Sequence, residues 1–476
     1  MLSLLLTALT IGEPTRADLA AAYLRFEHAL RAHPPKATER AAIEKGFDAA
    51  TLDYFTGAGT RAIERIDGLT AVLDPDQAQN SAERAADALA LDVEPREVSA
   101  SAGARLTLRL RRLRTIDAAP ASAVVRVVLP TASGRRVLAE VVIQEPFEAD
   151  STTATITVPG GGDHPGTRID LEVELEVLGA RPRRVTSVAL VGEPLAAIRA
   201  RIVADLARVE PDGPPLLQAS VTCRARAALL DPRPSANDSA RFLVDLAAHA
   251  AEVELEAQAL TRGRDPYRRR VGDLWRVVRL ADGSELPVRV FAPESACGEA
   301  RIPLVLALHG AGGDENMFLA GYGLGTIGDL AREHGFVVAC PRAGFTGTTP
   351  AAFDAIVEAL LFTHAIDVKR IHVVGHSMGA GSAAALRSAR SDRIASVVLL
   401  AGSARDAGGP TSSPMFLAGG ELDPLASSAS LRRASEAARA AGARVEFTLL
   451  EARGHTLFVG EILPRAMRWC LAQKLP

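Results

Sequence analysis

The sequence has few of the features that mark specialised classes of protein. Only 4 of its 476 residues are cysteines, and they form no Cys-x-x-Cys pair and no Cys/His spacing that suits zinc. We therefore expect no disulfide scaffold, no redox role and no metal site. The cysteines are Cys223, Cys297, Cys340 and Cys470.

No sign of charge predominates either. The 54 basic and 57 acidic residues give a formal net charge of -3, and only 4 of the basic residues are lysines. A nucleic-acid-binding domain usually has a pI above about 9, so we expect no nucleic-acid partner. We attribute the arginine excess to a GC-rich genome.

Long hydrophobic runs are also missing. None approaches the ~18 apolar residues of a membrane span, so we expect no span. Met1–Ile11 has the apolar length of a signal-peptide core but lacks a basic start and a clean cleavage site. Periplasmic or secreted and cytoplasmic locations therefore stay open, and so does the oligomeric state.

The length and the changes of pattern along the chain predict several domains. After the signal-like segment 1–12, helical spacing of apolar residues predicts a helical region over 13–92 and a helical linker region over 193–263. Between them, 93–192 alternates apolar and polar residues in about seven short runs, which predicts an antiparallel β-sandwich. None of these regions shows a catalytic pattern, so we expect them to shield the site, bind an extended substrate or anchor the protein.

Residues 264–476 show a different pattern, which predicts an α/β domain. Two strands joined by the Asp282-Gly283 turn come first. Continuous apolar runs then alternate with helical segments, which is typical of a mostly parallel, doubly wound sheet covered on both faces. The predicted strands are Leu304–Leu308, Phe336–Ala339, Ile371–Val374, Ser396–Leu400, Met415–Ala418 and Val445–Leu450.

The sequence Gly375-His376-Ser377-Met378-Gly379 follows one of these strands and precedes a helical run. This G-x-S-x-G context is typical of a turn that exposes a nucleophilic serine, with glycines where side chains would clash with neighbouring elements. We therefore predict Ser377 as the nucleophile.

A serine hydroxyl needs a base, and the base needs an acid that orients it. His455 is the only histidine after Ser377, and it follows a predicted strand. Asp423 follows the strand before that, at the strand ends where open α/β sheets place their sites. We predict His455 as the base and Asp423 as the acid; Glu421 and Asp406 are the alternative acids.

The tetrahedral intermediate needs fixed N–H donors for its oxyanion. His309-Gly310-Ala311-Gly312-Gly313 follows the first parallel strand, and its small residues let backbone amides approach a substrate. We expect the amides of Ala311 and Met378 to form the oxyanion hole. His309, His372 and His376 are interpreted as framework residues.

With these motifs, the C-terminal ~210 residues resemble the α/β-hydrolase superfamily. The glycine-rich loop, Asn316-Met317-Phe318, Ile366-Asp367 before the nucleophile strand and the serine turn are similar to those of dienelactone hydrolases, polyhydroxybutyrate-depolymerase-like esterases and prolyl-oligopeptidase catalytic domains. The resemblance implies acyl transfer to water through Ser377, Asp423 and His455, with no metal or organic cofactor.

Three functions follow from this resemblance. The first is a carboxylic ester hydrolase acting on a small or polymeric ester. The second is a serine peptidase of prolyl-oligopeptidase type, although the N-terminal half shows no repeated propeller blade. The third is a binding protein with an inactive hydrolase domain, although all three triad residues are present.

Two further patterns argue against other functions. Gly323–Gly328 fits G-x-G-x-x-G but follows no strand, so we do not expect a nucleotide site. Ala401–Pro414 is too short for the helical lid that many lipases insert between the corresponding strands.

Overall fold

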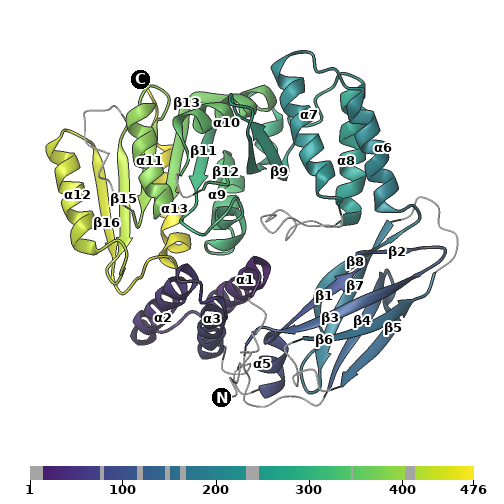
Figure 1. Cartoon of the computed structure of the whole chain (residues 1–476). Helices are drawn as coiled ribbons and strands as arrows, with labels where there is room; N and C mark the ends of the chain where they lie inside the picture. Colours follow the sequence, from purple (N-terminus) through teal and green to yellow (C-terminus); the bar gives the residue numbers. More distant parts are fainter. Residues whose placement is uncertain are drawn as a thin grey trace, which may run out of the picture. The chain divides into compact units, whose positions relative to one another are not determined.

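The computed structural model divides into two compact units (Figure 1). The first comprises Met1–Phe26, Leu52–Ile202 and Leu229–Glu254, and the second comprises Glu27–Thr51, Val203–Ala228 and Leu255–Pro476. The structure describes residues 14–74, 80–114, 122–144, 151–160, 168–231, 246–344, 347–402 and 413–476. The signal-like segment 1–12 lies outside these ranges, and none of the described helices has an apolar stretch of the length that a bilayer span requires.

Two β-sheets packed on one hydrophobic core form the centre of the first unit. One sheet has the strand order β1-β3-β6 and the other β2-β8-β7-β4-β5. Alternating residues such as Leu106, Leu108 and Leu110 are buried between the sheets, while the residues between them face outward. The strands are β1 (Leu89–Glu94), β2 (Glu97–Ser99), β3 (Ala104–Arg112), β4 (Ser122–Thr131), β5 (Gly134–Gln144), β6 (Ser151–Val158), β7 (Arg168–Val177) and β8 (Arg183–Val191).

One pairing in this sandwich differs from the antiparallel arrangement expected from the sequence. The short strand β2 runs parallel to β8 at the edge of the larger sheet. Because β1 and β2 are consecutive but belong to different sheets, no hairpin turn fixes the direction of β2. Alternation within a strand shows which face is buried and not the direction of its neighbour.

Helices precede and follow the sandwich in the chain. Before it come α1 (Arg16–Ala32), α2 (Ala37–Phe55), α3 (Gly59–Leu73) and α5 (Ser81–Asp87), and after it α6 (Leu195–Ala207), α7 (Gly213–Ala228) and α8 (Leu246–Thr261). The second unit includes α7 and residues 37–51 of α2. These two segments therefore pack with the α/β domain, although they lie far from it in the sequence.

The second unit is built on an 8-stranded sheet with the order β16-β15-β14-β13-β11-β12-β10-β9. Strands β11 to β16 are parallel, and β9 and β10 form an antiparallel hairpin at one edge. The strands are β9 (Gly272–Arg279), β10 (Glu285–Ala292), β11 (Ile302–Leu308), β12 (Val337–Pro341), β13 (Ile366–His376), β14 (Ser396–Leu400), β15 (Met415–Gly420) and β16 (Val445–Leu450).

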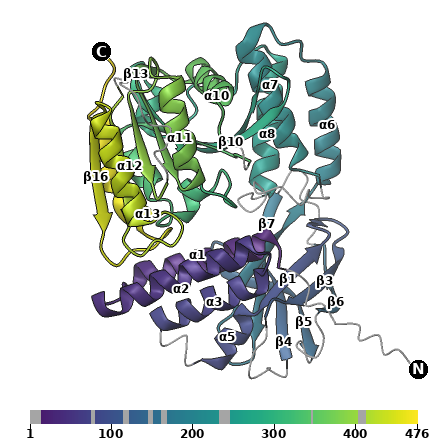
Figure 2. The ribbon, with the colours of Figure 1, turned by 60° about the vertical axis from the view of Figure 1, so that its left-hand side comes forward.

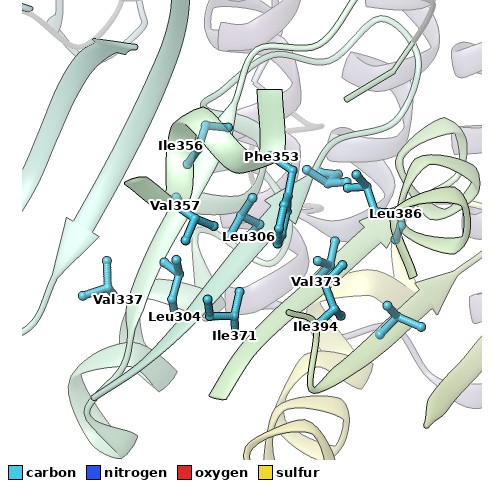
Figure 3. Close-up of a cluster of buried hydrophobic side chains, with 14 of the residues drawn as sticks. Leu304, Leu306, Val337, Phe353, Ile356, Val357, Ile371, Val373, Leu386 and Ile394 are labelled. Carbon is cyan, nitrogen blue, oxygen red and sulfur yellow. The ribbon is translucent and has the colours of Figure 1, made fainter. Parts of the chain in front are cut away.

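Helices cover both faces of this sheet, as its apolar strands require. Residues of α10, α11 and α12 pack on one face, and residues of α9 and α13 pack on the other. Figure 2 labels α10, α11, α12 and α13 beside the sheet. Figure 3 shows part of the first layer, where Phe353 and Val357 of α10 meet Leu306 and Val373 of the central strands. The helices are α9 (Thr326–His334), α10 (Pro350–Thr363), α11 (Met378–Ala389), α12 (Ser428–Ala440) and α13 (Phe458–Leu471).

Helix α7 protects the outer edge of the sheet. The exposed backbone of an edge strand can pair with another chain unless it is covered. Here the side chains of Gln218 and Thr222 donate to the carbonyl of Val277 on β9, and the Gln218 amide oxygen accepts from the N–H of Arg279. The segment interpreted as a linker thus completes the α/β unit.

The nucleophile strand is longer than the sequence suggested. Ile366 and Asp367, which we expected before the strand, lie within β13, where Ile366 pairs with Ile302. The register then shifts before Leu304 pairs with Ile371. The polar residues Asp367, Lys369 and Arg370 interrupt the apolar run there, so the pattern indicated only the buried second half.

Candidate active site

Ser377 lies at a strained turn between β13 and α11. Its backbone has φ 54 and ψ -114, and positive φ is uncommon for any residue with a Cβ. Such strain persists only where the surroundings enforce it, and it is concentrated at functional sites. The turn therefore has the geometry expected for an exposed nucleophile.

The two glycines of the motif are required by close contacts. A Cβ at Gly375 would lie 2.1 Å from the carbonyl oxygen of Gly379, and a Cβ at Gly379 would lie 2.1 Å from that of Leu308. Backbone atoms cannot move away as a flexible side chain could. The steric reason given for these glycines from the sequence is confirmed.

The serine turn and the glycine-rich loop meet at the point where the sheet reverses its winding. Strands β11 and β13 are neighbours, but β11 leads to α9 on one face and β13 leads to α11 on the other. Open α/β sheets form their ligand crevices at such a point, beyond the carboxyl ends of the strands. A Cβ at Gly310 would lie 3.3 Å from the Cβ of Ser377, so the two loops are in direct contact.

His455 and Asp423 are brought together beyond the ends of β16 and β15. The His455 Nδ1 donates to Asp423 Oδ2 at 2.8 Å, and both residues are buried. The other carboxylate oxygen, Oδ1, accepts the N–H groups of Leu425 and Ala426. Because Nδ1 carries the proton of a neutral ring in this arrangement, Nε2 is left as the acceptor that a general base needs.

The alternative acids differ in position. Glu421 is exposed, and its carboxylate accepts the N–H of Ala452. Asp406 lies outside the described residues. Of the acids whose positions are described, Asp423 is the one bonded to the histidine ring.

Ser377 and His455 are linked through His376, the residue before Ser377 in the chain. His376 Nε2 bonds to the carbonyl oxygen of His455 at 2.9 Å, and the two rings lie 4.9 Å apart. In the described part of the chain, no hydrogen bond joins the Ser377 hydroxyl to the His455 ring. Catalytic hydrogen bonds are often long without substrate and tighten when it binds.

The hydrogen bonds of His376 assign its tautomer. Its Nε2 faces a carbonyl, so Nε2 must donate and Nδ1 must accept. The Tyr322 hydroxyl donates to Nδ1 at 2.8 Å and accepts the N–H of Gly310 at 3.4 Å. Burial lowers the pKa of His376 to about 3, which keeps the ring neutral. One directed chain of bonds thus joins the glycine-rich loop to the histidine loop.

Replacing Tyr322 with phenylalanine should test this chain. The change leaves the buried Nδ1 of His376 without its donor, which costs about 1–3 kcal/mol. We expect the free energy of unfolding to fall by that amount. Because His376 holds the backbone of His455, we also expect kcat to fall roughly tenfold, which corresponds to about 1.4 kcal/mol in the activation barrier. Denaturant unfolding and steady-state kinetics measure the two effects; a variant with wild-type values for both would exclude a role for the hydroxyl.

The amides expected to bind an oxyanion are available. Among the described residues, neither the N–H of Ala311 nor that of Met378 donates to a protein acceptor. Met378 is the first residue of α11, where helix geometry leaves N–H groups unpaired. Both amides border the Ser377 turn, one from each loop.

Buried polar groups hold the glycine-rich loop in place. Glu315 is fully buried and accepts bonds from Arg342 and from the indole N–H of Trp275. Burial by itself would raise the pKa of Glu315, but the bonds and the charge of Arg342, together with the bond from Trp275 and a backbone N–H, outweigh it and hold that pKa below its usual value. His309 accepts the N–H of Ala343 at Nε2 and bonds to the carbonyl of Gly310 through Nδ1, as expected of a framework residue.

The glycines of the G-x-G-x-x-G pattern have structural explanations. Gly323, at φ 56, packs against Gly460 of α13, where a Cβ would lie 2.9 Å from the Gly460 Cα. Gly325, at φ 76, precedes α9, and a Cβ there would meet the carbonyl oxygen of Leu319 at 2.4 Å. Within the described ranges, no group of three or more His, Cys, Asp or Glu residues could hold a metal ion.

Two residues near the site, Glu44 and Asp48 of α2, were not predicted from the sequence. The Glu44 carboxylate accepts the N–H of Gly454 at 3.0 Å, and Asp48 accepts the N–H of His455 at 3.0 Å. The available signal was a pair of acids four residues apart, each next to an apolar residue, Ile43 and Phe47, on one helix face. Acids at such positions are buried only when they have partners.

Comparisons with known proteins agree with this fold. Residues 304–470 match the model of the alpha/beta hydrolase family. The C-terminal part of this chain is an α/β-hydrolase domain, with its serine turn after the central strand β13. The comparison with curated proteins found no match.

Several solved structures are similar to the same part of the chain. FphF, a fluorophosphonate-binding serine hydrolase of Staphylococcus aureus, is 15% identical over 42% of this chain and 99% of its own, with a TM-score of 0.35. The S-formylglutathione hydrolase FrmB from Staphylococcus aureus is 15% identical over 42% and 98%, with a TM-score of 0.35. Est1E from Butyrivibrio proteoclasticus is 14% identical over 42% and 99%, with a TM-score of 0.34. Similarity at this level does not indicate an activity, so the function has to be inferred from the residues of the site itself.

Proposed function

We propose that the protein is a serine hydrolase that cleaves carboxylic esters through an acyl-enzyme on Ser377. The observation that carries the proposal is the buried bond between His455 Nδ1 and Asp423 Oδ2, 2.8 Å long, beside the strained Ser377 turn. It supports His455 as a general base whose acceptor nitrogen is free to take a proton from the serine. The amides of Ala311 and Met378 support an oxyanion site.

The mechanism has two displacement steps. Ser377 Oγ attacks the acyl carbon while its proton moves to His455 Nε2, and the amides of Ala311 and Met378 bind the developing oxyanion. The alcohol leaves with that proton, and the acyl group remains on Ser377. A water molecule then gives a proton to His455 and attacks the acyl carbon; the acid leaves, and the serine regains its proton. No metal or organic cofactor takes part.

Two assays test this proposal on the full-length protein. We expect a fluorophosphonate probe to label the wild-type protein, and a short-chain nitrophenyl ester to be hydrolysed faster than a proline-containing peptide anilide. Strong anilide cleavage with negligible ester turnover would instead indicate a peptidase of prolyl-oligopeptidase type. Absence of both labelling and Ser377-dependent hydrolysis would indicate a binding protein with an inactive domain.

A further inference from the structure

The loop that carries His455 is held by side chains from α2, some 400 residues earlier in the sequence. Its two consecutive N–H groups, those of Gly454 and His455, donate to Glu44 Oε2 and to Asp48 Oδ1 at 3.0 Å each, and His455 also reaches Asp48 Oδ2 at 3.2 Å. Glu44 is fully buried and Asp48 is 5% exposed. The histidine backbone is therefore anchored in a site from which water is largely excluded.

The loop and the helix are shaped to fit each other at Gly454. A Cβ at this position would lie 2.3 Å from Asp48 Oδ2 and 2.9 Å from its Cγ. Real Cβ atoms do not approach other atoms so closely, so the glycine is needed for the carboxylate of Asp48 to reach the loop. A side chain at position 454 would therefore displace the Asp48 carboxylate from the N–H of His455.

The carboxylates of Glu44 and Asp48 differ in their ion pairs. Glu44 pairs with Arg40 at 2.6 Å and lies 4.0 Å from Arg453, and both arginines also pair with Glu461 of α13. Asp48, in contrast, makes no ion pair with an arginine or lysine among the described residues. The two arginines near the loop therefore pair with Glu44 and Glu461 and not with Asp48.

The groups that face Asp48 are those of the catalytic site. It interacts electrostatically with His455, Asp423 and Glu44, of which only His455 can become positive. Burial raises the pKa of Asp48 to about 6, while the N–H bond and the charge of His455 act against this rise. A buried carboxylate without a cation partner destabilises the folded protein. The imidazolium of His455, which forms during the proposed reaction, would be such a partner.

We propose that Asp48 is a positioning residue for the catalytic histidine: with Glu44 it fixes the backbone of the Gly454–His455 loop, and its negative charge stabilises the imidazolium of His455. The inference rests on the proposed function, in which His455 becomes positive in each displacement step. Asp423 orients the ring by a direct bond, whereas Asp48 acts through the backbone and through its charge. The N-terminal helix α2 is then part of the active site.

Substitution of Asp48 by asparagine separates charge from hydrogen bonding. The amide oxygen can still accept the N–H of His455, but the charge is gone. We expect kcat for the nitrophenyl ester to fall about tenfold, which corresponds to about 1.4 kcal/mol of lost transition-state stabilisation, with KM changed less than about twofold. Because the buried charge is unfavourable in the folded state, the midpoint of denaturant unfolding at pH 7.5 should stay the same or rise.

The pH dependence of kcat/KM tests the role of the charge, because a purely structural role of Asp48 would leave it unchanged. A negative charge near the imidazole favours its protonated form, so the acid-side midpoint of the kcat/KM profile should move to lower pH in Asp48→Asn. The other titratable or charged groups at this loop are Arg40, Glu44, Glu421, Asp423, Arg453, Glu461 and His376, and the variant leaves them in place. Asp48→Ala, which also removes the acceptor, should lose more activity than Asp48→Asn.

Glu39→Gln is the matched control. Glu39 lies in the first turn of α2 and is exposed. In the described part of the chain, its carboxylate accepts only the N–H of Lys36, three residues earlier. This variant removes the same charge from the same helix and should keep the wild-type kcat and pH profile. An Asp48→Asn variant with wild-type kcat and an unmoved profile, or one that is only less stable, overturns the inference.

Ser377→Ala distinguishes this failure from failure of the proposed function. If hydrolysis disappears in Ser377→Ala but is unchanged in Asp48→Asn, the triad mechanism stands and the role of Asp48 is wrong. If hydrolysis persists in Ser377→Ala, the proposed function is wrong, and the role of Asp48 is wrong with it.

Discussion

Replacing Ser377 with alanine should lower kcat for ester hydrolysis by about 10⁴- to 10⁶-fold, the range seen when a nucleophilic serine is removed. The reason is that the proposed acyl-enzyme can no longer form, while the amides of Ala311 and Met378, which we propose bind the oxyanion, remain. Alanine keeps the Cβ, so the strained backbone at φ 54 is the same in both proteins. Steady-state kinetics with a nitrophenyl ester and labelling by a fluorophosphonate measure the loss.

Ser388→Ala is the control for this experiment. Ser388 lies near the other end of α11, where its hydroxyl bonds to the carbonyl of Ala384. The same chemical change at this position should leave both kcat and labelling at wild-type values. Residual hydrolysis above about 1% of wild type in Ser377→Ala, with labelling retained, would show that another residue is the nucleophile.

Replacing Asp423 with asparagine should lower kcat by about 10³- to 10⁴-fold. The expected cause is a change of tautomer. Asp423 Oδ1 accepts the N–H groups of Leu425 and Ala426, both at 2.8 Å, so an asparagine would keep its oxygen there. Its NH₂ group would then face Nδ1 of His455, which would have to accept, and Nε2 would carry the proton. A ring in that form cannot take the proton of Ser377.

The rival acids provide the controls for this prediction. Glu421→Gln changes an exposed carboxylate that bonds to the backbone of Ala452 and should keep kcat within about twofold, since surface substitutions are usually within ±0.5 kcal/mol. Asp406→Asn tests the other alternative directly. A large loss in either control, together with a small loss in Asp423→Asn, would assign the acid elsewhere.

The structure also changes the interpretation of the N-terminal half. Its sequence shows no catalytic pattern, and we expected it to act outside the chemistry. Residues 37–51 of α2 nevertheless belong to the α/β unit and hold the loop of His455. A deletion that ends near residue 264 would therefore remove part of the candidate site as well as the sandwich.

Much of the α/β domain could be predicted because its signals are local. Apolar runs indicate the buried strands, and alternating helical segments require parallel pairing. The serine turn is equally local, since strand, glycines and helix lie within a few residues of Ser377. The boundary of β13 was misjudged because residues 366–370 mix polar and apolar side chains.

The sequence by itself therefore determined the α/β class, the strained serine turn and the order of serine, acid and histidine along the chain. Only the tertiary structure decided which described acid bonds to His455, how Tyr322 and His376 join the two loops, and that Asp48 contacts the histidine backbone. The physical reason is distance along the chain. A turn depends on the conformational limits of adjacent residues, whereas the contact of Asp48 with His455 depends on how two distant segments pack, and no local pattern records that packing.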